Sequence, residues 1–186
     1  MAKIFINFGH APNGDPDPGA IGPNGLRESD VNADVGAIVA DDLRAAGCEV
    51  MTYQSDDLQD ICDKANEWGA DAVVAIHCNS FSADSTGMEI FTSRGQTMAD
   101  RLATLIMSQM AGEFPALPVR GDWSDGDVDK EAGLYVLIHT DAPAVLVELA
   151  FISNPAEESI LGSSKGKRMF AAAIARGVTD YLQEVS

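Results

Sequence analysis

The sequence predicts an α/β fold with an open, twisted, mostly parallel but mixed sheet of about six strands and helices on both faces. Two observations predict this fold. Short apolar runs alternate along the chain with segments whose apolar residues recur at helical spacing. Several of the runs are apolar almost throughout, which is typical of strands that helices bury on both faces.

The first elements are expected in the order strand, helix, strand. The run KIFINF at residues 3–8 predicts the first strand, and a loop rich in Gly, Pro and Asp follows it. Helical spacing then extends from about Glu28 to Ala46, and Gly47 is placed to end this helix. The run CEVMTY at residues 48–53 predicts the second strand.

The middle of the chain continues the alternation. Helical spacing over residues 58–68 is followed by DAVVAIH at residues 71–77, which we expect to be a strand buried on both faces. The run MEIFTS at residues 88–93 predicts a further strand, and residues 98–110 predict a third helix. The polar segment from about Glu113 to Glu131 is expected to be an ordered surface loop.

The last part of the chain predicts two strands and a helix. The strands are LYVLI at residues 134–138 and AVLVEL at residues 144–149, separated by a turn around residues 141–143. Helical spacing over residues 170–182 predicts the final helix.

Length and composition indicate one domain that spans residues 1–186. The chain is 46% hydrophobic and 22% charged, without repeats or a linker-like segment. No apolar stretch has the length of a signal-peptide core or of a membrane span, so neither export through this chain's own leader nor a membrane partner is expected. Three cysteines without paired metal spacing indicate reduced structural thiols.

The charge of the chain argues against a nucleic-acid partner. The formal net charge is −17, and the 12 Lys and Arg residues are scattered without forming a basic patch. A field of this sign repels polyanions. The acidity is consistent with a solvated surface, with a divalent cation or with a substrate that carries positive groups.

Two of the three histidines, His10 and His77, come directly after predicted strands. In open α/β sheets, ligands bind beyond the carboxyl ends of the strands, so both imidazoles are expected at one functional edge. Glu28 begins the first long helix, where a carboxylate is favoured by exposed amides in any case. If the preceding loop returns to the same edge, two histidines and a carboxylate form a hydrolytic zinc site.

Glu148 interrupts the otherwise apolar strand AVLVELAF. A carboxylate in such a strand is unfavourable unless it is paired, reaches water or is used in chemistry. Beside a zinc-activated water, Glu148 would serve as general base and then as acid for the leaving amine. The sequence therefore predicts a zinc hydrolase with His10, Glu28 and His77 as ligands and Glu148 as the catalytic residue.

The sequence offers three other side chains that a metal or a substrate could contact. Cys78 is expected to point to the opposite sheet face from His77, which excludes it as a ligand. Asn79 shares the side of His77 and is a candidate to bind substrate or to cap the end of the strand. His139 is a candidate to donate to a substrate carbonyl, or it is simply exposed.

Five segments together resemble the zinc-dependent N-acetylmuramoyl-L-alanine amidases of the Amidase_3 type, and they cover most of the chain. They are FGH with His10, DPGAIGPNGLRESDVN with Glu28, AIHCNS with His77, GMEIF, and LYVLIHTDAPAVLVELAFISNPAEE with Glu148. The resemblance implies that zinc is held by those three residues and that Glu148 is catalytic. It also implies peptidoglycan as substrate, cleaved between the lactyl group of N-acetylmuramic acid and L-alanine.

The sequence departs from the family pattern in two places. Asn7–Ala11 stands where the family has an Asp-Pro-Gly-His-Gly-Gly run, and Ile138 and His139 stand where it often has Arg-Asn. From the given residues, we expect neither the cell-wall-binding repeat nor the signal peptide that many secreted members carry. An excised catalytic domain, a phage-type endolysin and an autolysin freed by lysis are the alternatives, and a separate or removed wall-binding domain is the favoured explanation for targeting.

Two other functions stay open at this point. A zinc peptidase or deacetylase on the same fold would use the same metal, water and carboxylate, because these groups alone do not choose the scissile bond. A catalytically silent wall-binding module would keep the fold without the reaction. Zinc content and the chemistry of the released ends distinguish the three.

Overall fold

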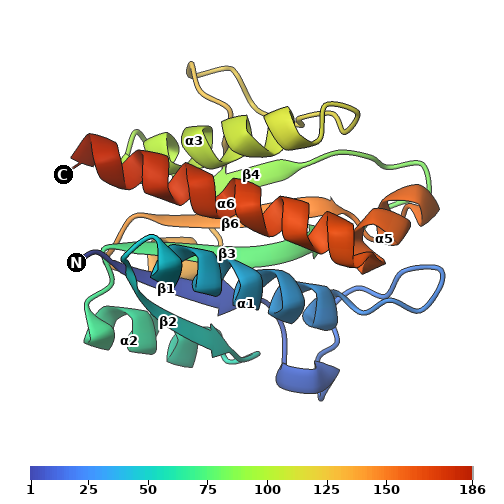
Figure 1. Ribbon diagram of the computed structural model, residues 1–186, viewed down its shortest axis with the longest axis horizontal. Coiled ribbons are helices and arrows are strands. Elements are labelled where there is room, and N and C mark those ends of the chain that lie inside the picture. The colour runs from blue at the N-terminus through green and yellow to red at the C-terminus, as the bar shows by residue number, and fades with distance from the viewer. Residues whose placement is uncertain (186) are drawn as a thin grey trace.

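The chain folds around one mixed six-stranded sheet in a computed structural model, which describes residues 1–185 (Figure 1). The strand order is β2-β1-β3-β6-β4-β5. The first four strands in this order run parallel, β4 is antiparallel to β6, and β5 is parallel to β4. The strands are β1 (Lys3–Phe8), β2 (Glu49–Gln54), β3 (Ala72–Asn79), β4 (Glu89–Thr92), β5 (Lys130–Glu131) and β6 (Ala144–Phe151).

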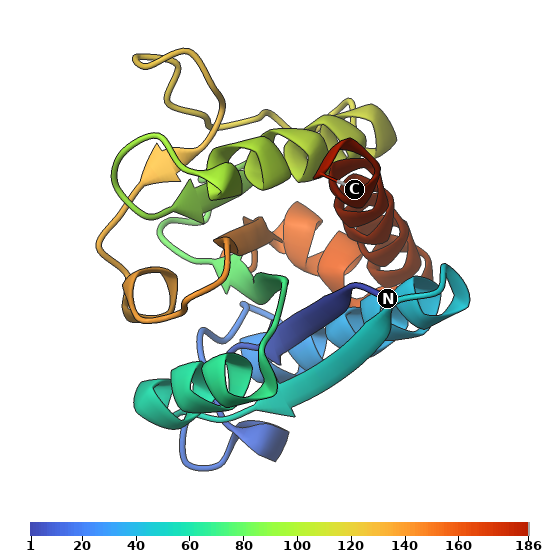
Figure 2. The ribbon, with the colours of Figure 1, turned by 90° about the vertical axis from the view of Figure 1, so that its left-hand side faces the viewer.

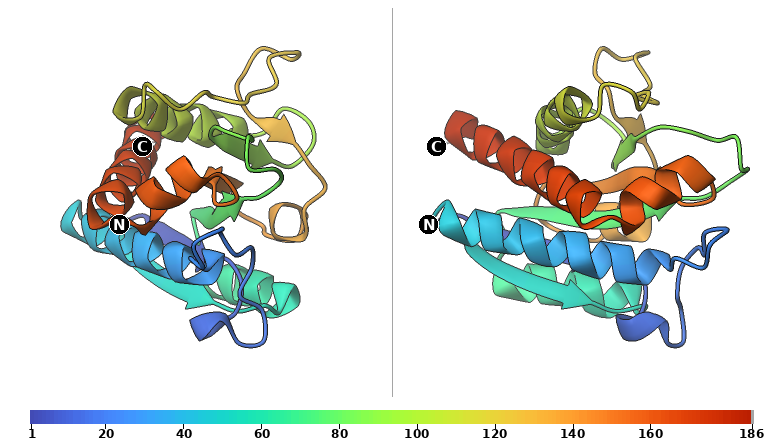
Figure 3. Two further views of the ribbon diagram at one scale, coloured as in Figure 1. Left: turned by 90° about the vertical axis from the view of Figure 1, so that its right-hand side faces the viewer. Right: turned by 45° about the vertical axis from the view of Figure 1, so that its right-hand side comes forward.

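Helices cover both faces of the sheet, as the sequence predicted (Figure 2). Helices α1, α3 and α6 lie on one face, and α2 and α4 lie on the other; both views of Figure 3 show the sheet between them. The helices are α1 (Glu28–Ala45), α2 (Leu58–Trp68), α3 (Met98–Glu113), α4 (Tyr135–Ile138), α5 (Pro155–Gly162) and α6 (Ser164–Val185), and Pro12–Gly14 form a short 3-10 turn.

Local signals in the sequence explain where these helices begin and end. Thr97 forms a capping box with Asp100 at the start of α3, and Asn154 caps α5 in front of Pro155. Gly47 follows the end of α1 with a φ of 94°, a conformation that glycine adopts without strain. The predicted boundaries of α1, α2 and α3 therefore agree with the structure to within a few residues.

The prediction of a strand at residues 134–138 was wrong, because Tyr135–Ile138 form the short helix α4. The five-residue run LYVLI is too short for its apolar pattern to distinguish a helix from a strand. Leu137 packs against the cluster beneath α2, and the Thr140 hydroxyl donates to the Val136 carbonyl, which closes the turn. The sixth strand is instead β5, within the segment that was expected to be loop.

Alternation along β3 and β6 decides which side chains face the site. Ile76 and Cys78 of β3 belong to the core cluster shared with α1, α3 and α6. Val73 and Ala75 point the other way, toward α2 and α4. His77 continues this second row, and it is partly exposed because α2 and α4 cover only the earlier part of the face.

No helix within residues 1–185 combines the length and the apolar composition needed to cross a bilayer.

Candidate active site

His10, Glu28 and His77 converge, as the sequence predicted. One donor atom from each residue lies within 4.8 Å of those of the other two, and this is the only such group of three or more acidic, histidine or cysteine residues among residues 1–185. His10 follows β1, Glu28 is the first residue of α1, and His77 lies near the end of β3. The parallel strands thus bring both imidazoles to one edge of the sheet.

Glu28 lies between the two imidazoles. Its Oε1 is 3.0 Å from His10 Nε2 and 3.0 Å from His77 Nδ1, and it also accepts a hydrogen bond from the Cys78 amide. Its Oε2 accepts from the Ala20 amide at 2.9 Å. Burial acts to raise the pKa of Glu28, but hydrogen bonds with His10 and His77 lower it well below its ordinary range, so the carboxylate is ionised.

Asp17 orients His10. The Asp17 Oδ2 atom lies 2.7 Å from His10 Nδ1, and Asp17 Oδ1 accepts from the Gly19 amide. This contact directs His10 Nε2 toward Glu28, in the carboxylate–histidine arrangement found at many zinc sites. Burial acts to lower the pKa of His10, but hydrogen bonds to Glu28 and Asp17 outweigh it and raise the pKa to about 9, so the site favours a positive charge.

Two glycines make room for the imidazole rings. A Cβ on Gly9 would overlap the ring of His77, and a Cβ on Gly19 would lie 2.5 Å from His10 Cδ2. Gly19 also has a φ of 67°, which favours glycine. With two imidazoles, one carboxylate and a carboxylate behind His10, the residues present fit a zinc ion with an open position.

Glu148 lies beside the predicted ligands. It pairs in register with His77 across β3 and β6, and its neighbours Val147 and Leu149 point into the opposite core, so its side chain shares the face of His77. Its Oε2 is buried and has no hydrogen-bond partner within residues 1–185. Burial, together with the negative charges of Glu28 and Glu89, raises the pKa of Glu148 to about 8. Such a group accepts and releases a proton near neutral pH.

Glu89 is a further buried carboxylate at this site, and sequence reasoning missed it. It pairs in register with Glu148 across β4 and β6. Its Oε1 accepts from Arg120 Nε at 2.5 Å and from Lys130 Nζ at 3.0 Å. The signal that identified Glu148, a carboxylate inside an apolar strand, is also present in GMEIF and would have identified Glu89.

The two candidate substrate-binding residues, Asn79 and His139, lie in different parts of the fold. Asn79 lies at the end of β3, where its Nδ2 donates to Glu89 Oε2 at 2.9 Å and its Oδ1 accepts from the Ser80 amide. His139 lies before the amino end of β6, stacked on Tyr135 with ring centroids 3.8 Å apart. A substrate contact from either residue stays a prediction.

Cys78 lies on the opposite sheet face from His77, as expected. It is buried in the core cluster shared with α1, and its Sγ lies 3.6 Å from Asn32 Oδ1. The thiol is therefore part of the helix-packed layer and not of the candidate metal site.

Two curated proteins of Bacillus subtilis are similar to the chain over nearly its whole length. The chain is 35% identical to the uncharacterized protein YqiI of Bacillus subtilis, over 97% of this chain and 85% of that protein. It is 36% identical to the N-acetylmuramoyl-L-alanine amidase LytC of Bacillus subtilis, over 96% of this chain and 35% of LytC. The chain thus spans most of one relative but about a third of the other.

A solved structure has the same fold. The N-acetylmuramoyl-L-alanine amidase AmiC2 of Nostoc punctiforme superposes with a TM-score of 0.87 at 29% identity, covering 98% of this chain and 97% of that one. Residues 4–180 match the Amidase_3 family, described as N-acetylmuramoyl-L-alanine amidase. The chain therefore belongs to the Amidase_3 family.

Proposed function

We propose that this chain is a zinc-dependent N-acetylmuramoyl-L-alanine amidase, with peptidoglycan as its substrate. The bond cleaved is the amide between the lactyl group of N-acetylmuramic acid and L-alanine of the stem peptide. The observation that carries the proposal is the position of Glu148, a buried carboxylate paired in register with His77 beside a group of metal-binding residues. Family membership supports the choice of substrate.

His10, Glu28 and His77 would hold the zinc ion. Zinc bound there would supply Lewis-acid polarisation of the amide carbonyl and would lower the pKa of a bound water. Asp17 would keep the His10 ring turned so that Nε2 faces the ion.

Glu148 would move the proton. Its carboxylate takes a proton from the attacking water and then gives it to the nitrogen of L-alanine as the amide bond breaks. Its raised pKa suits both steps, because a group with a pKa near the working pH is a competent base and a competent acid. The products are a free lactyl carboxylate and a stem peptide with a free amino terminus.

Purified peptidoglycan tests the proposal. We expect the zinc-loaded wild type to release new L-alanine amino termini, and Glu148→Gln to lose at least about 100-fold in rate while it retains zinc. Glu67→Gln, the same change at an exposed residue of α2, should keep full activity. New reducing sugar ends would indicate a glycosidase, and cleavage inside the stem peptide would indicate a peptidase. A wild type that binds the cell wall but releases no product would indicate a silent wall-binding module.

A further inference from the structure

The segment 120–131, between α3 and α4, is strongly acidic. It contains five carboxylates, at Asp122, Asp125, Asp127, Asp129 and Glu131. Asp129 differs from the others because it is only 2% exposed. A carboxylate withdrawn from water to this extent requires a compensating positive charge, a proton or several hydrogen-bond donors.

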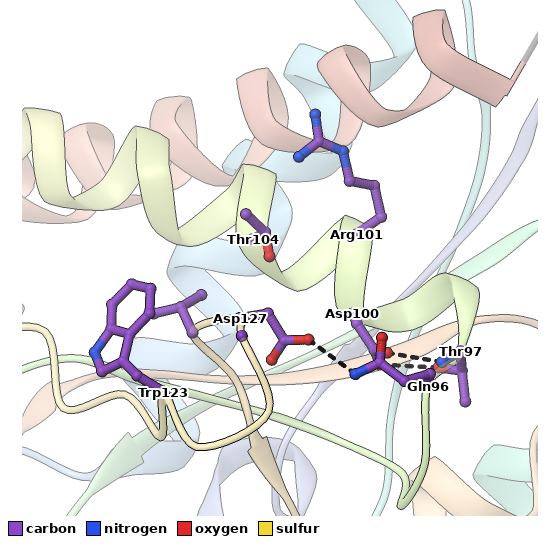
Figure 4. A pocket seen from close by; sticks show the side chains of 9 residues that line it. Gln96, Thr97, Asp100, Arg101, Thr104, Trp123 and Asp127 are labelled. Atoms are coloured by element: carbon purple, nitrogen blue, oxygen red, sulfur yellow. Dashed lines mark hydrogen bonds between the residues drawn. The ribbon is translucent and has the colours of Figure 1, made fainter.

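The hydrogen bonds of Asp127 and Asp129 leave two buried oxygens unused. Asp129 Oδ2 accepts from the Thr92 hydroxyl. Asp127 Oδ2 accepts from Gln96 Nε2 at 3.5 Å (Figure 4). Asp129 Oδ1 and Asp127 Oδ1 are both buried and have no hydrogen-bond partner within residues 1–185. Burial and the adjacent Asp127 carboxylate raise the pKa of Asp129 to about 6.

The neighbouring positive side chains do not neutralise this pair. Arg120 and Lys130 both contact Glu89, and Arg101 contacts Glu184. No ion pair within residues 1–185 includes Asp127 or Asp129. The nearby carboxylate of Asp100 adds further negative charge, and its own oxygens accept from Thr97 in the α3 capping box.

We propose that Asp127 and Asp129 bind a divalent cation of the calcium type, at a site separate from the His10, Glu28 and His77 group. The donors are hard carboxylate oxygens without imidazole or thiolate, which suits calcium and not zinc. Two carboxylates are few for calcium, so backbone carbonyls and water would complete the shell. The dissociation constant is accordingly expected in the weak range of roughly 10⁻⁴–10⁻³ M.

The bound cation would influence the position of Glu89, beside Glu148, through strand β5. Asp129 is followed directly by Lys130, the first residue of β5, whose amine contacts Glu89. Glu89 in turn pairs in register with Glu148. Holding Asp127 and Asp129 together would fix the segment that supplies Lys130.

Trp123 provides a direct probe, because its exposed indole lines the same cavity as Asp127 (Figure 4). Terbium, which binds calcium sites, is added to the zinc-loaded protein, and its luminescence is excited through tryptophan. We expect saturable luminescence that calcium displaces. Trp123→Phe should remove most of the luminescence but keep the effect of calcium on Tm.

Calcium at ten times its dissociation constant should raise Tm by about 3 °C. Asp129→Asn and, separately, Asp127→Asn should weaken calcium binding at least tenfold, so that a failure of one variant to fold leaves the other informative. Asp84→Asn, at an exposed residue, should have no effect. Calcium is added at concentrations up to about 10-fold above the expected range of the dissociation constant. If it produces neither displaceable luminescence nor a Tm shift, the two carboxylates share a proton and do not bind a cation.

Discussion

His77 and Glu148 occupy paired positions on the adjacent parallel strands β3 and β6, with both side chains on the face that α2 and α4 leave partly open. This pairing fixes the distance between a predicted zinc ligand and the predicted base through backbone hydrogen bonds of the sheet. Sites built on strands in this way are held more rigidly than sites on loops.

Glu148→Asp tests how far that geometry matters. The change keeps the carboxylate but withdraws it by one methylene, and a misplacement of about 1 Å is expected to lower kcat by roughly 100-fold. Steady-state kinetics on a soluble muramoyl peptide would separate kcat from KM, and the zinc content should equal that of the wild type. Activity near the wild-type level in Glu148→Asp would contradict a role that depends on the register of β3 and β6.

Gly9→Ala is expected to disturb the metal site without unfolding the chain. The added Cβ would overlap the imidazole of His77, so the ring must move and the zinc affinity should fall at least about tenfold. Competition with a zinc chelator measures this affinity. Gly112→Ala is the matched control, because nothing lies within 4 Å of its added Cβ on α3, and it should leave zinc binding unchanged while stabilising the helix by up to about 1 kcal/mol.

Asp17→Asn removes the charge behind His10 and keeps the size of the side chain. We expect the zinc affinity to fall by about 10- to 100-fold, because the carboxylate fixes the ring orientation and increases the basicity of the ligand. The same chelator competition measures the change. Asp15→Asn, in the same loop, serves as a control, and equal zinc affinities for the two variants would exclude the role assigned to Asp17.

Glu89→Gln should make stability less dependent on acid pH. Burial acts to raise the pKa of Glu89, but Arg120 and Lys130 hold it below its ordinary range. The ionised group therefore contributes stability that is present above the unfolded-state pKa of about 4.3 and is lost as pH falls through the lower folded-state pKa. Urea unfolding from pH 6 to pH 3 should show Glu89→Gln less stable than wild type at the upper end, with the two free energies of unfolding converging at the lower end. A constant difference across this range would contradict the ion-pair assignment.

The sequence was sufficient to predict which residues come together at the ends of the parallel strands and at the start of α1. His10 and His77 follow apolar runs, and a sheet places the carboxyl ends of such runs at one edge. Glu148 was recognisable because a carboxylate inside an apolar strand is unfavourable without a function. These inferences depend on the spacing of apolar residues and on the chemical type of single side chains, which are local properties of the sequence.

The parts that could not be predicted depend on contacts between distant segments. Residues 134–138 form an apolar run that is compatible with a strand as well as with a helix. They form a helix because Leu137 packs against the cluster beneath α2. The two-residue strand β5 has no periodicity to detect, since its pairing with β4 defines it. Asp17 could not be assigned to His10 because the loop conformation that joins them leaves no pattern in the sequence.

Glu158 links the loop before Glu28 to helix α5. Its buried carboxylate accepts from the Asn24 amide, from Asn24 Nδ2 at 2.6 Å and from the Leu26 amide at 3.2 Å. Glu158→Ala leaves these donors without their partner and should lower the free energy of unfolding by roughly 2–4 kcal/mol. Because this loop leads directly into Glu28, zinc affinity should fall as well.

Glu158→Gln separates the effect on the loop from a general loss of stability. The amide oxygen still accepts from one or two of the three donors, so both the free energy of unfolding and the zinc affinity should lie between those of wild type and Glu158→Ala. Glu67→Ala, at an exposed position on α2, controls for removal of a glutamate from a helix. If Glu158→Ala lost stability but bound zinc as tightly as wild type, the loop would hold Glu28 in place without Glu158, through the bond from the Ala20 amide to Glu28.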